Sequence, residues 1–335
     1  MHGGSSTIAE DKAIEAYAVA VSAFQKGNLP RAIKFWKKVV NNKAVKEKIK
    51  AKAYLGMGFA HSKSDKFKDA LSSFKLALSK FQGLNDKKSQ VETLGIIGGL
   101  YFRNNYIKDA LTTYQTGLYL AKQIKNREME ADILGDIGSV LDFLDKYDDA
   151  IDFYSRSLKI YRKMPKQKGR RGEARALSDL GLVHYHADKL SEARSLLEKA
   201  SRLMKKHNDK RGEANVNRTL GDIYVELGQT DIAEKHYKRA QKYFQIHKML
   251  IGLLNIEVGF GKILFNREEY IKAKDKFENA LEIATKYKHL KLTATALLFL
   301  SRIYEKLGNI KEAQNNRIKA NKILKDLGIQ IEKET

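Results

Sequence analysis

The feature that most constrains this chain is a pair of small residues, twelve positions apart, that recurs eight times. The second member of each pair is an alanine, mostly at intervals of 40 residues: Ala32, Ala70, Ala110, Ala150, Ala193, Ala233, Ala273 and Ala313. The first members are Ala20, Gly58, Gly98, Gly138, Gly181, Gly221, Gly261 and Ser301. Two helices approach to about 8 Å only where their side chains are short. The pattern therefore predicts eight helical hairpins, each with a small crossing pair.

Two further positions keep the same phase. An aromatic residue follows the alanine by four positions, one helical turn along the same face, in six units: Trp36, Phe74, Tyr114, Tyr154, Tyr237 and Phe277. The turn inside each hairpin carries Gly, Asn or Asp, which tolerate a left-handed backbone: Gly27, Asp65, Asn105, Asp145, Asp188, Gly228 and Gly308, with Glu268 as the exception. Apolar residues recur at three- and four-residue intervals throughout. We therefore predict an all-α fold.

This pattern resembles the tetratricopeptide repeat, W-x-x-L-G-x-x-Y followed by A-x-x-x-F, over roughly residues 10–327. Leu220 and Gly221 with Tyr224 match its first half closely. The period exceeds the usual length of about 34 residues, and in this it is similar to the long-helix subgroup of kinesin light chain and the Leu-Gly-Asn-type modulators of G-protein signalling. The resemblance implies a right-handed superhelical solenoid of eight repeats, with an inner groove lined by the first helix of each.

The array divides in its middle. The 43-residue interval between Ala150 and Ala193 coincides with Pro165, and the residue after the alanine changes there from Ile or Leu to a polar residue. We expect a flexible tail over 1–9, four repeats over 10–162, a basic Pro- and Gly-containing linker or long loop over 163–172, four repeats over 173–327 and a tail over 328–335. The linker acts as a hinge or as a loop that continuous stacking absorbs.

The last hairpin lacks the aromatic residue and has Arg317 in its place. Ile310, Ile318, Ile323 and Leu324 form an apolar stripe opposite polar residues. Terminal repeats of such arrays carry a polar outer face. We therefore expect a capping helix and no ninth repeat.

Little in the sequence favours catalysis. The chain has no cysteine, which excludes disulfides, thiolate metal sites and cysteine nucleophiles. The G-x-G triplets at Gly56 and Gly259 include the crossing glycines, and His184 and His186 are two apart, so they point to different faces of a helix. We expect a non-enzymatic protein without cofactor or metal. The N-terminal twelve residues lack the features of a signal peptide, which predicts a soluble cytoplasmic protein.

The net charge of +23 predicts attraction to acidic proteins, anionic lipid or nucleic acid. Basic residues concentrate where one hairpin passes to the next, and they form either a docking edge for acidic or phosphate groups or solvated helix ends. The candidates for this basic edge are Lys163, Lys166, Lys168, Arg170, Arg171, Lys205, Lys206, Lys210 and Arg211.

The resemblance also implies which residues point into the groove: Lys52, Phe59, Phe102, Arg103, Asp132, Asp142, Arg175, Tyr185, Arg218, Asp222, Lys262, Phe265 and Arg302. Aromatic rings supply contact area and arginines recognise carboxylates, which favours a scaffold or adaptor that binds an acidic and apolar peptide segment. One alternative is a basic array that binds RNA, although the acidic groove residues oppose a phosphate backbone. Another is a regulatory domain that senses a short peptide.

Overall fold

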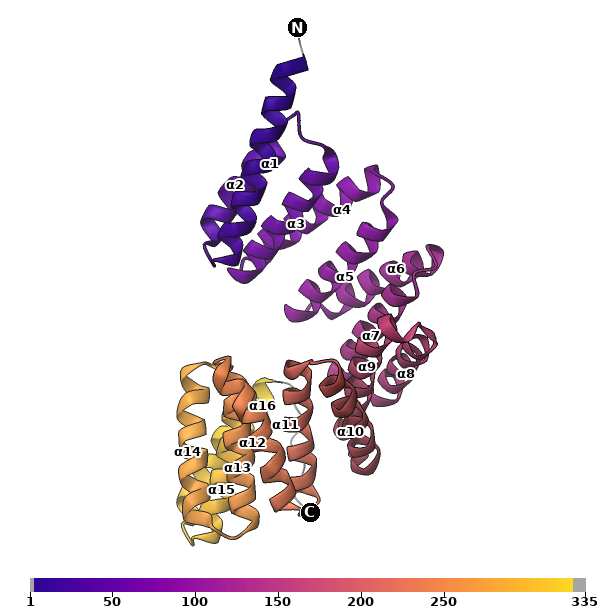
Figure 1. Ribbon diagram of the computed structural model, residues 1–335. Helices are drawn as coiled ribbons and strands as arrows, with labels where there is room; N and C mark the ends of the chain where they lie inside the picture. The colour runs from indigo at the N-terminus through magenta and orange to yellow at the C-terminus, as the bar shows by residue number, and fades with distance from the viewer. Residues whose placement is uncertain (1–2, 328–335) are drawn as a thin grey trace. The chain divides into compact units, whose positions relative to one another are not determined.

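The computed structural model describes residues 3–327, and side chains from residue 11 on except those of 167 and 168. Within this range it contains sixteen helices and no strand (Figure 1). They are α1 (Gly3–Gln25), α2 (Leu29–Asn41), α3 (Glu47–Lys63), α4 (Phe67–Gly83), α5 (Lys87–Arg103), α6 (Ile107–Gln123), α7 (Arg127–Phe143), α8 (Tyr147–Lys163), α9 (Lys166–His186), α10 (Leu190–Lys206), α11 (Lys210–Glu226), α12 (Thr230–Ile246), α13 (Leu250–Asn266), α14 (Tyr270–Lys286), α15 (Leu290–Lys306) and α16 (Ile310–Asp326).

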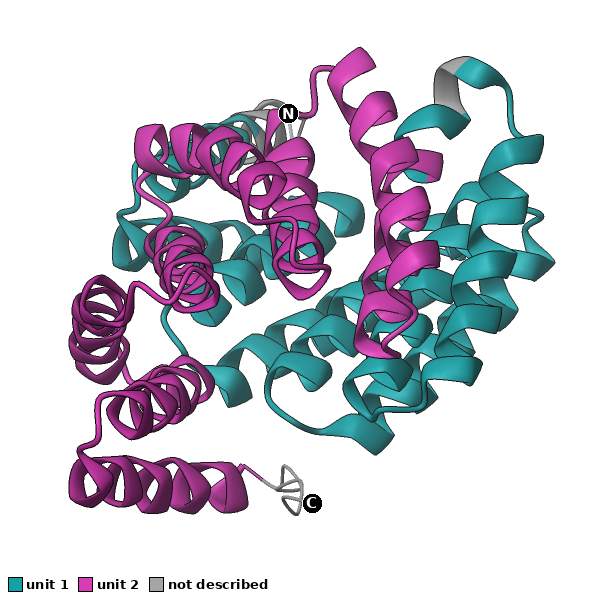
Figure 2. Ribbon diagram, turned by 90° about the horizontal axis from the view of Figure 1, so that it is seen from below, with its two compact units in different colours: residues 1–172 teal, residues 173–335 magenta. Residues whose placement is uncertain are grey.

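The helices pair into eight hairpins, from α1 with α2 to α15 with α16, which confirms the all-α prediction. Cα-level packing divides the chain into two compact units, residues 1–172 and 173–335 (Figure 2). We call them unit 1 and unit 2. The boundary lies inside α9, close to the break in the repeat spacing.

The small residues lie buried where the two helices of each hairpin cross, as the spacing predicts. All eight marker alanines are fully buried. Each crossing glycine faces the residue sixteen positions later on the second helix, so a Cβ on Gly98 would lie 2.6 Å from the Tyr114 ring and one on Gly221 2.5 Å from the Tyr237 ring. The rings themselves are 0 to 3% exposed. In the last hairpin Ser301 takes the crossing position and donates a hydrogen bond to the carbonyl of Ala313 (2.8 Å).

The turns inside the hairpins also follow the prediction. All eight predicted turn residues have positive φ, from 54° at Asp65 to 78° at Gly308, and Glu268 shares this conformation at 61°. After Gly228, the amide of Gln229 reaches back to the carbonyl of Tyr224 (2.8 Å). This bond closes the helix end as in a Schellman motif.

The predicted linker over 163–172 is wrong for most of its length. Only Met164 and Pro165 separate α8 from α9. A proline directly before a helix removes no hydrogen bond of that helix, because the first helical amides have no partner inside the helix. Gly169 and Gly172 are buried against Tyr161, so these glycines permit close packing instead of ending a helix.

Two other boundaries differ from expectation. The helix α1 begins at Gly3 where a tail over 1–9 was predicted, since nothing in residues 5–12 breaks a helix. Residues 1 and 2 and the predicted tail over 328–335 lie outside the described residues. In α16 the expected apolar stripe is not buried as a whole: Ile310 and Ile318 are 54% and 70% exposed. Arg317 and the buried Asn316 take the positions that face the neighbouring helix, which turns Ile318 outward.

Candidate functional site

The first helices of neighbouring hairpins contact one another, as α5 does with α7, α11 with α13 and α13 with α15. We call the surface that these first helices form the inner face of each unit. Every residue that the sequence assigned to the groove lies on one of these first helices, and the two units differ in the side chains that the helices carry. That these residues line one groove stays a prediction.

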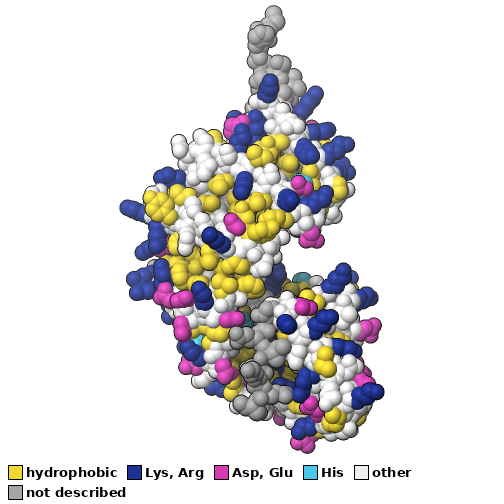
Figure 3. Space-filling model, turned by 180° about the vertical axis from the view of Figure 1, so that it is seen from behind, with side chains coloured by type: hydrophobic (Ala, Val, Ile, Leu, Met, Phe, Trp, Pro, Cys, Tyr) yellow, Lys and Arg dark blue, Asp and Glu magenta, His cyan; other side chains and the backbone are white. Residues whose placement is uncertain are grey.

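The inner face of unit 1 is aromatic. The ring of Phe102 on α5 meets that of Phe143 on α7 edge to face, with centroids 5.4 Å apart. Phe59 on α3 meets the buried Phe74 in the same way at 5.2 Å. Phe59 and Phe143 remain 42% and 59% exposed. On the face of the molecule that Figure 3 shows, hydrophobic side chains gather in patches between basic ones.

The predicted polar residues of unit 1 are arranged unevenly around this aromatic surface. Lys52 and Arg103 are exposed. Asp132 is half-buried and accepts a hydrogen bond from the Tyr161 hydroxyl, which ties α7 to α8. Asp142 is half-buried near the end of α7. Phe143 was not predicted, although it stands 41 residues after Phe102, one repeat plus one residue.

The inner face of unit 2 is polar on α9 and α11. The Tyr185 hydroxyl donates to Oε1 of Glu226 (2.6 Å), which links α9 to α11. On α11, Arg218 Nη1 pairs with Oδ2 of Asp222 at 2.5 Å. The other oxygen of Asp222 accepts from the hydroxyl of Tyr237 on α12 (2.7 Å).

This network changes the pKa values of its two tyrosines. Burial, reinforced by the charge of Asp222, raises the pKa of both Tyr185 and Tyr237 well above the ordinary value, and Arg218 opposes the shift. Both hydroxyls are therefore neutral donors at physiological pH. Arg218 has its carboxylate partner inside the chain, so it is not free for the bidentate recognition that the sequence suggested. Arg175 is exposed on α9.

A second cluster on unit 2 surrounds Phe299 of α15. Its ring stacks on the buried Phe277 (4.7 Å, 6°) and meets Phe265 edge to face (5.8 Å). Two cations lie over the Phe299 ring, with Lys262 Nζ 5.6 Å and Arg302 Cζ 5.5 Å from the centroid. Within the described part of the chain neither cation has a carboxylate at ion-pair distance. The structure thus brings the predicted Lys262, Phe265 and Arg302 together on a residue that the prediction missed.

The basic edge falls into two groups. In unit 1, Lys163 ends α8, Lys166 begins α9, Arg171 is exposed and Arg170 half-buried, while the side chain of Lys168 lies outside the described residues. In unit 2, exposed residues flank the turn between α10 and α11: Lys205, Lys206, Lys210 and Arg211. That the groups form one docking edge stays a prediction.

Among the described residues, no group of three His, Cys, Asp or Glu side chains could hold a metal ion. None of the described helices has the length and apolar character needed to cross a membrane.

Comparison with known proteins decides the family. The family model described as tetratricopeptide repeat matches residues 89–163, 172–245 and 252–317, more than half of the chain. The chain belongs to the tetratricopeptide repeat family. No curated protein matches it.

Several solved structures resemble this tetratricopeptide repeat protein at low identity. Aspartyl phosphate phosphatase F from Bacillus subtilis is 14% identical with a TM-score of 0.69, covering 86% of this chain and 74% of its own. A Rap protein complexed with competence and sporulation factor is 16% identical (TM-score 0.63; 89% and 80% covered). The Rap conjugation gene regulator of plasmid pLS20, in complex with the Phr* peptide, is 15% identical (TM-score 0.61; 84% and 78%). At these identities the similarity shows the fold.

Proposed function

We propose that this protein is a non-enzymatic scaffold that binds a polypeptide segment, acidic and apolar in composition, on the inner face of unit 2. The observation that carries the proposal is the pair of cations over Phe299. Lys262 and Arg302 each lie within 6 Å of that ring centroid without a carboxylate partner among the described residues. A cation held by an aromatic face and lacking an anion is placed to bind one.

The residues around this pair support an acidic and apolar composition for the segment. Phe265 and Phe299 are half-buried and offer apolar contact beside the two cations. A ligand that places an Asp or Glu side chain next to an apolar one satisfies both. The exposed Glu226, held by Tyr185, adds a negative charge toward the other end of this face, which favours a cationic or neutral residue there. Two similar structures are complexes with a peptide or factor, which supports peptide binding by this fold.

A peptide library displayed on phage tests the proposal directly. Selection on the whole protein should enrich segments in which Asp or Glu adjoins Leu, Ile or Phe. The enriched peptides should bind at least about tenfold more weakly to the Lys262→Glu, Arg302→Glu variant, because two charge-assisted contacts reverse sign. The matched control changes Lys235 and Lys242, two exposed lysines on α12, to Glu.

Two results would contradict the proposal. Equal weakening by the control variant would show that the peptides respond to overall charge. Failure to enrich acidic segments, together with binding to random RNA that falls steeply with salt, would favour the nucleic-acid alternative instead.

A further inference from the structure

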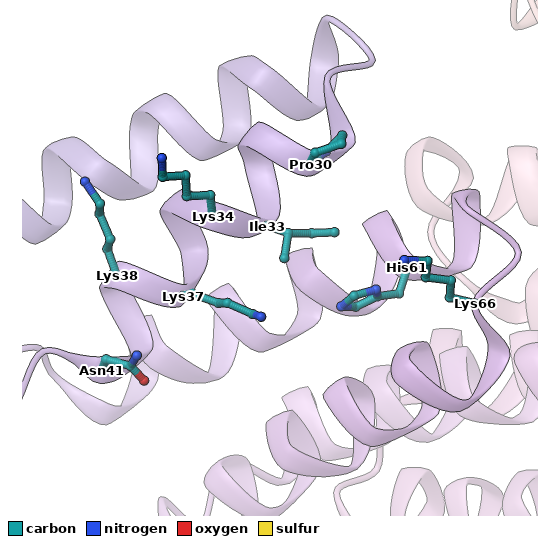
Figure 4. Close-up of a pocket in the computed structure, with 8 residues that line it drawn as sticks. All are labelled: Pro30, Ile33, Lys34, Lys37, Lys38, Asn41, His61 and Lys66. Atoms are coloured by element: carbon teal, nitrogen blue, oxygen red, sulfur yellow. The ribbon is translucent and has the colours of Figure 1, made fainter.

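A hollow in unit 1, formed mostly by α2, has lysine at four of its eight lining positions. Its volume is about 530 Å³, and it lies between α2 and the turn that joins α3 to α4 (Figure 4). Its lining combines four cationic side chains with polar and apolar ones: Lys34, Lys37, Lys38, Lys66, Asn41, His61, Pro30 and Ile33. Three of the lysines belong to one face of α2, while Lys66 stands on the opposite wall.

The lysines are unbalanced by acid. Lys34 lies three and four residues before Lys37 and Lys38, spacings at which like charges on a helix repel. None of the four lysines has a carboxylate at ion-pair distance within the part of the chain that the structure describes. Elsewhere in unit 1, by contrast, Glu47 bridges Lys50 and Lys80 at 2.8 and 2.6 Å.

The pKa of His61 depends on the charged side chains around this hollow. Its side chain is 13% exposed, and Figure 4 shows its ring pointing toward Lys37. The buried Nδ1 has no hydrogen-bond partner, since Oδ2 of Asp69 on α4 lies 3.9 Å away. Burial lowers the pKa of His61, and Lys66 and Lys37 lower it further, while Asp69 alone opposes them.

We propose that this hollow binds a phosphate-bearing anion through Lys34, Lys37, Lys38 and Lys66. Four lysines that line one hollow without carboxylate partners among the described residues complement a group that carries two or more negative charges. The volume lies within the range of ligand pockets and exceeds what a single phosphate fills. Pro30 and Ile33 give one wall an apolar surface, which suits a phosphate attached to an organic part. This site is independent of the peptide surface on unit 2.

Inorganic pyrophosphate is the probe, measured by calorimetry with the full chain at about 0.15 M salt, where charges beyond about 8 Å are screened. We expect Lys37→Glu, Lys66→Glu to weaken binding about tenfold or more. The matched control, Lys68→Glu, Lys75→Glu, changes two exposed lysines of α4 outside the lining by the same charge, and should weaken it less than about twofold. Circular dichroism establishes that each variant is folded.

The second readout is the titration of His61, followed by NMR of its ring protons. A bound anion adds negative charge opposite Lys37 and Lys66, so pyrophosphate should raise the pKa of His61 in the wild type and in the control variant. An unmoved His61, or equal weakening in both double variants, would overturn the proposal in favour of general attraction to a basic surface. Tighter binding of a phosphoserine tripeptide than of pyrophosphate would assign the phosphate to a protein, and the reverse order to a free small molecule.

Discussion

Two pairs of residues occupy the same place in the repeat and differ completely in chemistry. In unit 1, Phe102 and Phe143 meet edge to face at 5.4 Å. In unit 2, Tyr185 and Glu226 share a hydrogen bond of 2.6 Å. Each pair is 41 residues apart and joins the first helices of neighbouring hairpins. The frame of small residues fixes where these helices meet, and it leaves the character of the contact free to vary.

Substitutions of the small residues at the helix crossings should have the largest effects on the free energy of unfolding. A Cβ at Gly221 in unit 2 would lie 2.5 Å from the fully buried Tyr237 ring, whereas one at Gly138 in unit 1 would lie 2.9 Å from Tyr154. Overpacking a core costs about 1–3 kcal/mol. We expect Gly221→Ala to lower the free energy of urea unfolding by about 2–3 kcal/mol and Gly138→Ala by about 1.

Gly95 of α5 provides the control, because no atom lies within 4 Å of a Cβ built there. Gly95→Ala should stabilise the protein by about 0.5–1 kcal/mol through helix propensity alone. Equal losses at Gly221 and Gly138 would mean that the Tyr237 ring moves aside as readily as the Tyr154 ring, and the difference in contact distance would then have no effect on stability.

The two pairs should also differ in how the stability of the protein depends on alkaline pH. The pKa of Tyr185 is raised from 10.0, chiefly by burial, so the folded protein holds this proton more tightly than the unfolded chain. The stabilisation is complete below pH 10 and is lost as pH rises toward the folded-state pKa, by up to about tenfold in the folding equilibrium per pH unit. Tyr185→Phe should therefore make stability fall less steeply above pH 10, as urea unfolding at several pH values would show.

Phe143→Ala is the control for that experiment, because the Phe102–Phe143 pair has no proton to lose. It should shift stability equally at every pH. A change in its alkaline slope, or an unchanged slope in Tyr185→Phe, would contradict the assignment of the effect to Tyr185.

Much of this arrangement was predictable from spacing. Buried alanines, aromatic rings over glycines and positive φ in the turns all depend on the backbone of one hairpin, and that backbone repeats. The structural roles of positions that recur in every hairpin could therefore be predicted from a single sequence.

What depends on a neighbouring hairpin could be predicted less well. Phe143 and Phe299 lie off the positions taken from the family pattern, and only contacts between hairpins show their roles. The internal partner of Arg218 was visible in principle, since Asp222 follows it by four residues, the spacing of an ion pair on a helix. The exposure of Ile318 depends on which face of α16 Arg317 and Asn316 occupy, and periodicity alone did not fix it.

A smaller effect tests the energy of each contact. Tyr185→Phe should cost about 1 kcal/mol at pH 7 by removing one hydrogen bond, and Phe143→Ala about 0.5–1.5 by removing one aromatic pair. A double-mutant cycle with Glu226→Ala isolates the coupling between the Tyr185 hydroxyl and the carboxylate. A coupling near zero would show that the hydrogen bond contributes nothing, and the two units would then differ in appearance only.

The smallest expected effect lies in the turns. The four hairpin turns of unit 1 use Gly, Asp or Asn at the left-handed position, whereas unit 2 has Glu268 there at φ 61°. A left-handed backbone costs an ordinary residue more than it costs Asn, whose short side chain bonds locally. Glu268→Asn should therefore stabilise the protein by about 0.5 kcal/mol, and Asn105→Glu in unit 1 should destabilise it by a similar amount, both read from urea unfolding. The Glu268 side chain is exposed, so shortening it leaves the core packing unchanged and the backbone effect can be measured by itself. A loss of stability in Glu268→Asn would mean that this turn obeys a different rule from its counterpart at Asn105.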